Sequence, residues 1–402
     1  MARLDAMRTR QVELRNTAAL AAVGMLVAVA FGLSTVITPL YLMYQEAFGF
    51  SQLTLTLIYA AYAIGNVVAL LLFGRASDRA GRRATALSAV GVLIMATLVF
   101  MFARGVTWLY IGRILSGLGI GLASGTGNAW LAELADKGDK GYAAIIGTSS
   151  NFIGIGLAAL LSGLLAQYAP WPLRLSFAVY LVVVCAVAVL IWLTQETVRH
   201  PDHRRIEIRP QLALPRNIQA QFVAPAITGF GLMALVGFYA SLMPGILLHE
   251  LHIEARAAAG ALLFELAMIV ALVIVATQAL SSRTSMLWSL ALMIPAAAAI
   301  VTAQISASLW VMLGATAVVA ISAGLGYRGS LQVVNEIAPA DQRAAVVSTY
   351  FVCCFVGNAL PVIGVGVLSS LTDTTVADIA FSCMITTFAV VALIFGSMHR
   401  SE

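Results

Sequence analysis

The sequence predicts an all-α integral membrane protein, with twelve transmembrane helices in two pseudo-symmetric six-helix bundles. Of its 402 residues, 61% are hydrophobic and 10% are charged, whereas soluble domains have about 45–50% apolar and about 25% charged residues. Apolar runs long enough to cross a membrane occur twelve times along the chain. A long polar stretch, residues 195–221, divides these runs into two sets of six.

Each predicted span contains about 20 mainly apolar residues, the length needed to cross a bilayer. In the N-terminal bundle, residues 1–194, the predicted spans are 17–44, 54–73, 84–103, 108–132, 143–168 and 173–194. In the C-terminal bundle, residues 222–402, they are 222–248, 257–280, 284–303, 308–332, 344–370 and 376–397. The first run is longer than the 7–15-residue core of a signal peptide, so we expect it to be retained as a span.

Lysine and arginine are distributed unequally between the two sides of the predicted bundle. Most of them lie in the N-terminal segment, in the gaps after even-numbered spans, in the 195–221 linker and at the C-terminus. The opposite side carries Arg104, Arg174 and Arg256. Because cytoplasmic loops are enriched in positive charge, we expect both termini and the linker to be cytoplasmic.

The two halves resemble each other when the sequence is shifted by 203 residues. The shift superposes Glu133 on Glu336, Gly121 on Gly324, Gly154 on Gly357, and Gly163 on Gly366. The matches keep register across two spans and a loop, which favours an internal duplication. Parallel repeats with a binding site at their interface are an architecture of membrane transporters.

The gap between the second and third predicted spans reads GRASDRAGRR, residues 74–83, with five charges in ten residues. It resembles the signature of the major facilitator superfamily in the same loop, a pattern close to G-x-x-x-D-R-x-G-R-R. The chain matches it with Gly74, Asp78, Arg79, Gly81, Arg82 and Arg83. Together with the twelve spans and the central linker, the chain is similar to the bacterial twelve-span drug:proton antiporter branch.

The resemblance implies that residues 74–83 form a cytoplasmic gate. The glycines would allow tight turns, and the arginines would pair with acids such as Glu133 at the end of span four. These pairs would break when the two halves rock. The alternative is that the arginines only set topology, which leaves Asp78 and the two glycines unexplained.

Three ionisable residues inside the predicted spans are candidates for proton coupling, because such groups are costly in a membrane and are usually functional. Arg113 lies near the start of span four, where an arginine is associated with proton coupling in many members of the family. The alternative is an arginine that extends to the interface. Glu265 lies well inside span eight, where a carboxyl group could load and release a proton. The alternative is a buried ion pair with Arg328, the third candidate, or with Arg113.

Polar side chains within the spans are candidates to line a substrate cavity. They are Thr35, Thr38, Tyr41, Asn66, Asn128, Asn151, Tyr239, Tyr350 and Asn358. Asparagine and tyrosine also bridge neighbouring helices, so a structural role is the alternative for each.

Several other classes of function lack support in the sequence. No metal or cofactor site is expected, and the four cysteines lack metal-ligand spacing. HELHIE, residues 249–254, is not the H-E-x-x-H zinc signature, so we expect a solvated loop there, with contact to a transition metal as the alternative. Nucleic-acid binding is not expected either, because the arginines lie between apolar runs and form no basic face. We expect no enzyme, since the spans contain no nucleophile–base set.

The predicted function is secondary active transport by alternating access, as proton-coupled efflux of small amphipathic compounds. The antiporter Gly-Pro signature of span five is replaced here by Ala158-Ala159. The alternative is a symporter or facilitator for uptake of a small organic solute, and a receptor on a transporter fold is a further alternative. The expected partners are a small-molecule substrate, protons and the lipid bilayer. We expect a monomer in a bacterial cytoplasmic membrane.

Overall fold

The computed structural model describes residues 17–73, 76–135, 140–198 and 212–398. In this part of the chain, twelve helices are long and apolar enough to cross a membrane. The prediction of an all-α protein with twelve spans is thereby confirmed.

The helices of the first half are α1 (Thr17–Val36), η2 (Thr38–Leu40), α2 (Tyr41–Phe48), α3 (Gln52–Phe73), α4 (Ala76–Ala80), α5 (Arg82–Met101), α6 (Val106–Leu134), α7 (Lys140–Tyr168) and α8 (Pro172–Leu193). Those of the second half are η3 (Arg216–Ile218), α9 (Gln219–His249), α10 (Arg256–Ala276), α11 (Ser282–Ile305), α12 (Leu309–Ile337), α13 (Arg343–Leu371) and α14 (Thr374–Met398).

The first span is not one continuous helix. It was predicted to cover residues 17–44, but α1 ends at Val36 and a short 3₁₀ turn containing Pro39 separates it from α2. Proline has no backbone N–H and its ring clashes with the preceding helical turn, so it interrupts the helix. The span continues to Phe48, where Gly49 adopts a left-handed conformation with φ of 67° and ends it.

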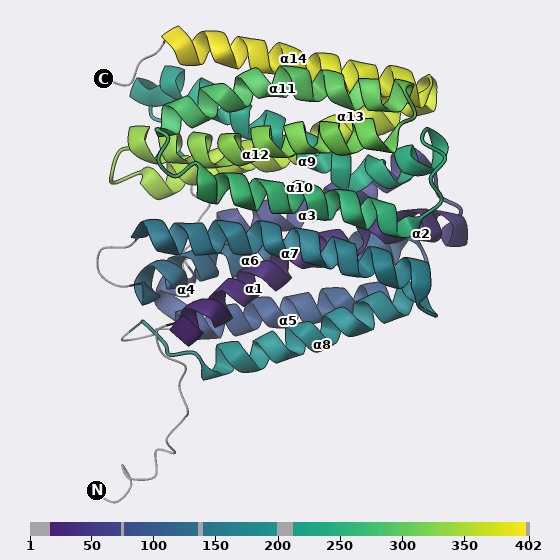
Figure 1. The fold of residues 1–402 in the computed structure, drawn as a ribbon. Coiled ribbons are helices and arrows are strands. Elements are labelled where there is room, and N and C mark those ends of the chain that lie inside the picture. Colours follow the sequence, from purple (N-terminus) through teal and green to yellow (C-terminus); the bar gives the residue numbers. More distant parts are fainter. Residues whose placement is uncertain (1–16, 74–75, 136–139, 199–211, 399–402) are drawn as a thin grey trace, which may run out of the picture.

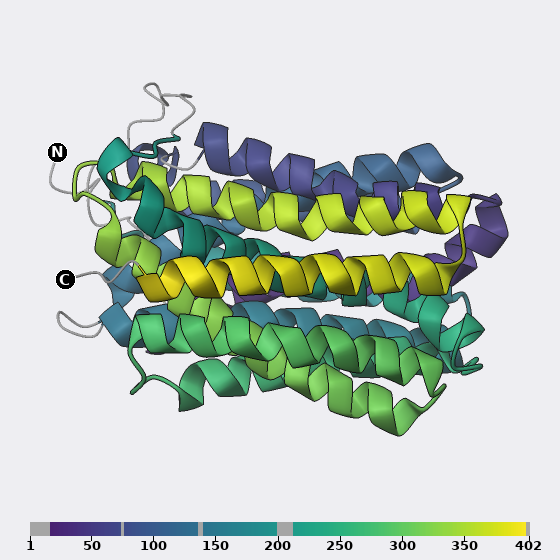
Figure 2. The ribbon, with the colours of Figure 1, turned by 90° about the horizontal axis from the view of Figure 1, so that it is seen from above.

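The two halves lie side by side, with α7 against α10 and α3 against α13 at their boundary (Figure 1). Figure 2 shows the molecule from the side of the second half, where α13 and α14 lie next to each other. We call the end of the bundle where α8 ends and α9 begins the linker end. The opposite end, with the α9–α10 and α13–α14 connections, is the distal end.

The glycines that match at a shift of 203 residues make equivalent contacts in the two halves. A methyl group on Gly154 would collide with the backbone of Ala28 in α1, and one on Gly357 with the backbone of Phe230 in α9. Gly163 approaches the backbone of α10, and Gly366 approaches Thr56 in α3. The first pair therefore packs helices within a half, and the second marks the two crossings between halves.

Candidate functional site

A cavity lies between the halves on the linker side of the bundle, and we call it the linker-end cavity. It has a volume of about 110 Å³ and is lined by residues of α1, α3, α6, α7, α12 and α13. Typical small-molecule sites measure roughly 300–1,000 Å³. Binding of a solute here therefore requires the halves to move apart at this end.

Three predicted cavity residues do line this space: Asn66, Asn128 and Asn151. Asn66 and Asn151 are buried, and the Nδ2 atom of Asn66 and the Oδ1 atom of Asn151 lack hydrogen-bond partners in the described chain. An unpaired buried donor or acceptor costs free energy. The cavity thus offers one donor and one acceptor to a ligand.

Aromatic rings that no sequence pattern indicated complete the wall of this cavity. Phe31, Tyr327, Phe351 and Phe355 line the cavity. Phe152 meets Tyr327 edge-to-face, with ring centroids 5.6 Å apart, at the contact between the halves. Every residue found in the lining is uncharged.

The three candidates in the first span pack against other helices instead. Thr35 donates a 2.8 Å hydrogen bond to the carbonyl oxygen of Ile155 in α7. Thr38 donates a 2.9 Å bond to the carbonyl oxygen of Ala240 in α9, across the boundary between the halves. Tyr41 accepts a hydrogen bond from Arg113.

Two tyrosines of the second half are also used within the protein. Tyr239 accepts a 3.1 Å hydrogen bond from Thr316, and the Tyr350 and Ser330 hydroxyls are 2.6 Å apart. Both tyrosines are fully buried. In this conformation both tyrosines therefore bridge parts of the protein, which was the alternative to lining a cavity.

Arg113 is completely buried in α6 and does not extend to the interface. Besides Tyr41, it donates to the carbonyl oxygen of Ser34 at 2.8 Å. Its guanidinium carbon lies 5.4, 5.3 and 5.7 Å from the ring centroids of Tyr41, Tyr59 and Tyr62. We call these three rings the tyrosine cage. Cation–π contacts of this kind stabilise a desolvated guanidinium, and in the described chain no carboxylate forms a salt bridge with it.

The tyrosine cage connects Arg113 to the second half through Asn358. The hydroxyls of Tyr59 and Tyr62 both donate to Asn358 Oδ1, at 2.8 and 2.7 Å. Asn358 Nδ2 in turn donates to the carbonyl oxygen of Met233 at 3.0 Å. This set of bonds, which we call the Asn358 latch, joins α3, α13 and α9. Tyr59 and Tyr62 were not predicted as site residues.

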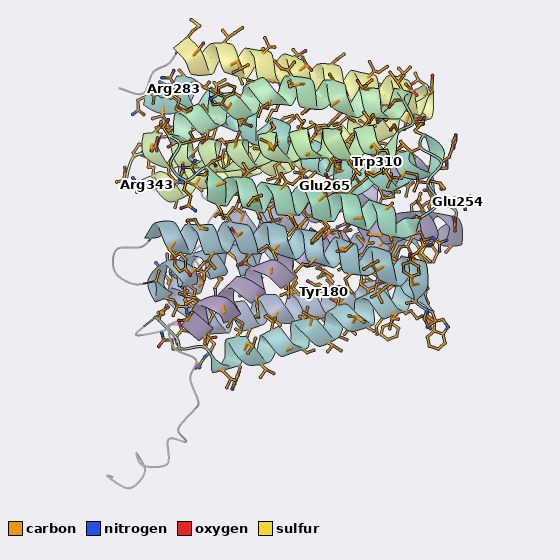
Figure 3. The ribbon with its side chains drawn as sticks, in the orientation of Figure 1. Tyr180, Glu254, Glu265, Arg283, Trp310 and Arg343 are labelled. Atoms are coloured by element: carbon orange, nitrogen blue, oxygen red, sulfur yellow. The ribbon has the colours of Figure 1, made fainter. Side chains whose placement is uncertain are left out.

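Glu265 lies midway along α10 (Figure 3). It shares a helix face with Ala261 and Leu272, which are exposed on the outside of the bundle. Its Oε2 atom is buried and has no hydrogen-bond partner in the described chain.

Arg328 bonds to Ser285 and to the carbonyl oxygens of Gln278 and Leu280. The predicted alternative of a Glu265–Arg328 or Glu265–Arg113 pair is therefore not what the structure shows.

Arg82 is the centre of the predicted gate. Its Nη1 lies 2.6 Å from Asp78 and its Nη2 lies 2.6 Å from Glu133. Arg79 lies in the last turn of the short helix α4, and Arg83 donates to the Trp192 carbonyl oxygen at 3.5 Å. Gly74 lies outside the described residues. The Arg82–Glu133 pair joins α5 to α6 within one half, so it does not itself bridge the halves.

The predicted gate also contacts Glu196 at the start of the linker, a residue that the sequence did not indicate. Its carboxylate accepts hydrogen bonds from the backbone N–H groups of Arg82 and Arg83, at 2.9 and 3.0 Å. An acid at a helix N-terminus satisfies unpaired N–H groups and the helix dipole. Gly81 precedes this helix with φ of 97°, a conformation that favours glycine.

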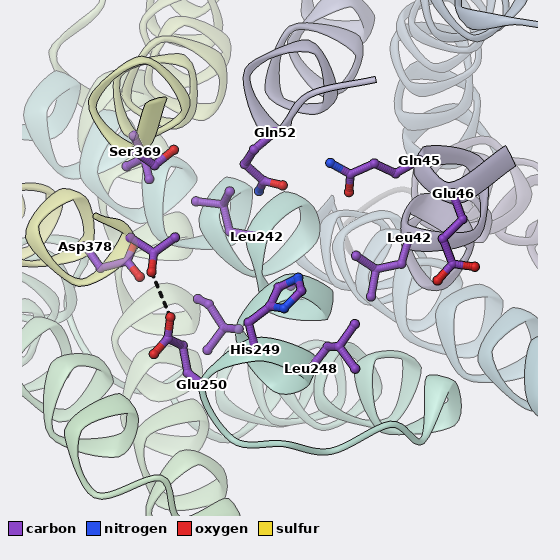
Figure 4. Close-up of a pocket in the computed structure, with 14 residues that line it drawn as sticks. Leu42, Gln45, Glu46, Gln52, Leu242, Leu248, His249, Glu250, Ser369 and Asp378 are labelled. Carbon is purple, nitrogen blue, oxygen red and sulfur yellow. Dashed lines mark hydrogen bonds between the residues drawn. The ribbon is translucent and has the colours of Figure 1, made fainter. Parts of the chain in front are cut away.

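A larger cavity opens at the distal end, with a volume of about 450 Å³. We call it the distal cavity. Two residues of HELHIE, His249 and Glu250, line it together with Glu46 and Asp378 (Figure 4). Among the described residues no group of three His, Cys, Asp or Glu could hold a metal ion. Asp378 was not predicted, because it lies near the start of an apolar run.

Comparison with protein families gives a match to the model described as Major Facilitator Superfamily, over residues 20–362. Among curated relatives, Alpha-ketoglutarate permease of Escherichia coli (strain K12) is 28% identical over 251 residues, covering 57% of each chain. Arabinose-proton symporter of Bacillus subtilis (strain 168) is 29% identical, covering 30% of this chain and 27% of the symporter. Sugar transporter ERD6-like 6 of Arabidopsis thaliana is 32% identical, covering 27% of this chain and 21% of that protein. These matches span between 21% and 57% of the relatives' own length.

Solved structures resemble the whole fold. A bacterial homolog of the human lysosomal transporter Spinster, in an inward-facing and unoccupied conformation, has a TM-score of 0.69 at 18% identity. The match covers 94% of this chain and 96% of that one. The occupied inward-facing form has a TM-score of 0.71 at 17% identity, covering 94% and 95%. At this identity the likeness concerns the fold alone.

Proposed function

Because the chain belongs to the Major Facilitator Superfamily, we propose that it is a secondary transporter that carries a small uncharged organic solute by alternating access. The linker-end cavity would be its binding site, widened when the halves separate. The orientation with the linker end in the cytoplasm, the bacterial cytoplasmic membrane and a monomeric state belong to the same proposal. The bias of lysine and arginine towards the linker end supports the orientation.

The observation that carries this proposal is the chemistry of the cavity wall. Asn66 and Asn151 present an unpaired amide nitrogen and an unpaired amide oxygen. Such a pair suits a solute with hydroxyl, carbonyl or amide groups, which both donates and accepts hydrogen bonds. The aromatic rings suit its apolar faces. A wall without charges disfavours phosphates and other strongly ionic substrates, because their charge would be desolvated without a partner.

Two observations favour uptake over the predicted efflux. The antiporter Gly-Pro signature is replaced by Ala158-Ala159. In addition, two of the curated relatives are described as a permease and a proton symporter. Proton-coupled efflux remains the second candidate, supported by Arg113, whose place in span four is associated with proton coupling in many members of the family.

Proton coupling in either direction is proposed to depend on Arg113 and Glu265. Both are ionisable groups within the spans, and the described chain gives neither an ion-pair partner. Groups of this kind in a membrane are costly and are usually retained for function. Arg328, which bonds to groups of its own half, is the weaker candidate.

The test uses purified protein in proteoliposomes with a panel of uncharged, cationic and anionic solutes. We expect uptake of an uncharged solute, and a loss of about tenfold or more when Asn66 and Asn151 are both changed to Leu, since two hydrogen bonds are lost. Asn335→Leu is the matched control, because Asn335 bonds to a carbonyl of its own helix. Equal rates in the two variants would reject the binding site.

The same vesicles decide the direction and the coupling. If a pH gradient accelerates solute movement in the same direction as the proton flux, the protein is a symporter. If it accelerates solute movement in the opposite direction, the protein is an antiporter. Glu265→Gln should leave downhill exchange intact and abolish the effect of the gradient. If the gradient acts equally on wild type and Glu265→Gln, Glu265 does not couple. Solute binding without flux would indicate a receptor.

A further inference from the structure

The distal cavity is large enough for a small molecule and is distinct from the linker-end cavity. Its volume of about 450 Å³ lies within the usual range for ligand sites. Both halves contribute to it: α2 and α3 from the first, and α9, α13 and α14 from the second. A molecule bound there would contact both halves at once.

The charges around this cavity are all negative when His249, which also lines it, is neutral. The side chains of Glu46, Glu250 and Asp378 line it, and no lysine or arginine is among its lining residues. One carboxylate has a local partner, since Thr374 Oγ1 donates to Glu250 Oε1 at 2.7 Å (Figure 4). The three carboxylates make the electrostatic potential in the cavity negative, which raises the local concentration of cations.

Asp378 has an unusual position among these acids. It is 3% exposed, yet it reaches the cavity wall and forms no ion pair in the described chain. Gln304 approaches it from α11, but the Gln304 amide nitrogen is itself buried without a hydrogen bond of suitable geometry. A buried carboxylate of this kind needs a counter-charge or a hydrogen-bond donor. The cavity in front of it is where such a group can enter.

The spacing and the lining define the kind of cation. No three acidic or histidine groups in the described chain are close enough to hold a metal ion, so the carboxylates surround a larger volume than a bare ion fills. Leu42, Leu242 and Val365 provide apolar wall between them. An ammonium group with attached carbon atoms satisfies both the charge and the apolar surface.

We propose that the distal cavity binds a small organic ammonium ion between Asp378, Glu250 and Glu46. Because the ligand contacts both halves, it stabilises the conformation in which the distal ends of the halves are close. This site goes beyond the proposed solute pathway and does not depend on it. Its occupancy is measured by binding, without any transport assay.

The experiment measures thermal unfolding of the purified full chain in detergent, with choline as the probe. Sodium chloride at equal ionic strength and 3,3-dimethyl-1-butanol, the uncharged analogue of choline, are the reference additives. We expect choline to raise the unfolding temperature more than either reference. Asp378→Asn should weaken the apparent choline affinity by about tenfold or more, as expected when a charged contact is lost.

Two further variants keep the test decisive. Glu254→Gln is the matched control, since Glu254 lies at the same end of the bundle but outside the lining of this cavity. It should bind choline like wild type. If Asp378→Asn does not elute as a monodisperse peak in size-exclusion chromatography, Glu250→Gln is used in its place. The proposal is overturned if choline has no effect on wild type, if sodium acts equally, or if both carboxyl variants respond like Glu254→Gln.

Discussion

The Arg113 guanidinium in α6 donates a hydrogen bond to the Tyr41 hydroxyl in α2. A fully buried cation without an acidic partner in the described chain is costly. The tyrosine cage compensates in part by presenting three ring faces. Such a costly arrangement, at the helix that borders the linker-end cavity, is expected to serve transport.

Changing Arg113 to Lys should reduce proton-driven transport by roughly tenfold or more. The planar guanidinium group stacks on aromatic rings and donates several hydrogen bonds in a fixed arrangement, and a lysine ammonium group cannot do both. The measurement is the initial rate in proteoliposomes, with and without a pH gradient. Arg283→Lys is the control, since Arg283 donates to the Gly396 and Ser397 carbonyl oxygens away from the cavity. If downhill exchange is lost along with driven transport, Arg113 has a structural role instead of a coupling role.

Breaking the Asn358 latch should favour opening of the distal end. Asn358→Ala leaves the hydroxyls of Tyr59 and Tyr62 without their acceptor, a loss of about 1–3 kcal/mol for the distally closed state. A cysteine at Thr56, which is buried against Gly366 at the α3–α13 crossing, reports on this. Its alkylation by a maleimide that does not cross the membrane should be faster in the Asn358→Ala background.

A control substitution that leaves the Tyr59 and Tyr62 hydrogen bonds intact distinguishes loss of the Asn358 latch from a general loss of helix packing. Asn335→Ala removes a bond within α12 alone and should not change the alkylation rate. Equal acceleration in both backgrounds would mean that the latch does not control the distal end.

Changing Asp78 to Asn should give a protein that inserts normally but transports poorly. The substitution removes one of the two carboxylates on Arg82 and leaves Glu133. Since Asp78 is half exposed, solvent screening keeps the effect on stability small, about 1 kcal/mol or less. The measurements are membrane abundance and transport rate, with the exposed Asp341→Asn at the same end as control. Normal transport would remove the gate hypothesis.

Adding a methyl group at Gly65 should destabilise the first half. The new Cβ would collide with the backbone of Ile114 and Leu118 in α6, and overpacking of this kind costs about 1–3 kcal/mol. Gly91→Ala is the control, since no atom lies within 4 Å of a Cβ there. The unfolding temperature should fall for Gly65→Ala and stay level or rise for Gly91→Ala. No difference between the two would contradict the packing described here.

Sequence patterns predicted the fold well because the membrane imposes them. Twelve apolar runs depend on local composition, and the structure has twelve helices that could span a membrane. The loop signature depends on local residue order, and the family match agrees with the resemblance that it indicated. The interruption at Pro39 was missed as a break because the apolar run continues through it.

The site was harder to predict, because the direction of a side chain depends on how neighbouring helices pack. Asn66 and Asn151 face the linker-end cavity, whereas Tyr239 and Tyr350 bond within their own half. Tyr59 and Tyr62 lie in an apolar run, and only helix packing brings them next to Arg113 and Asn358. Glu196 contacts the start of α5 from more than a hundred residues away, and no local pattern indicates such a contact.

The two crossings between halves have a mechanical consequence. At one crossing Gly163 lies against the backbone of Ala257 and Gly260, and at the other Gly366 lies against Thr56. Because a glycine makes the closest approach at each of these points, we expect the neighbouring helices to tilt past each other with few rotamer changes. Matching positions of the two halves, Gly163 and Gly366, form both crossings. In the proposed alternating access, these two crossings would serve as the pivot between the halves.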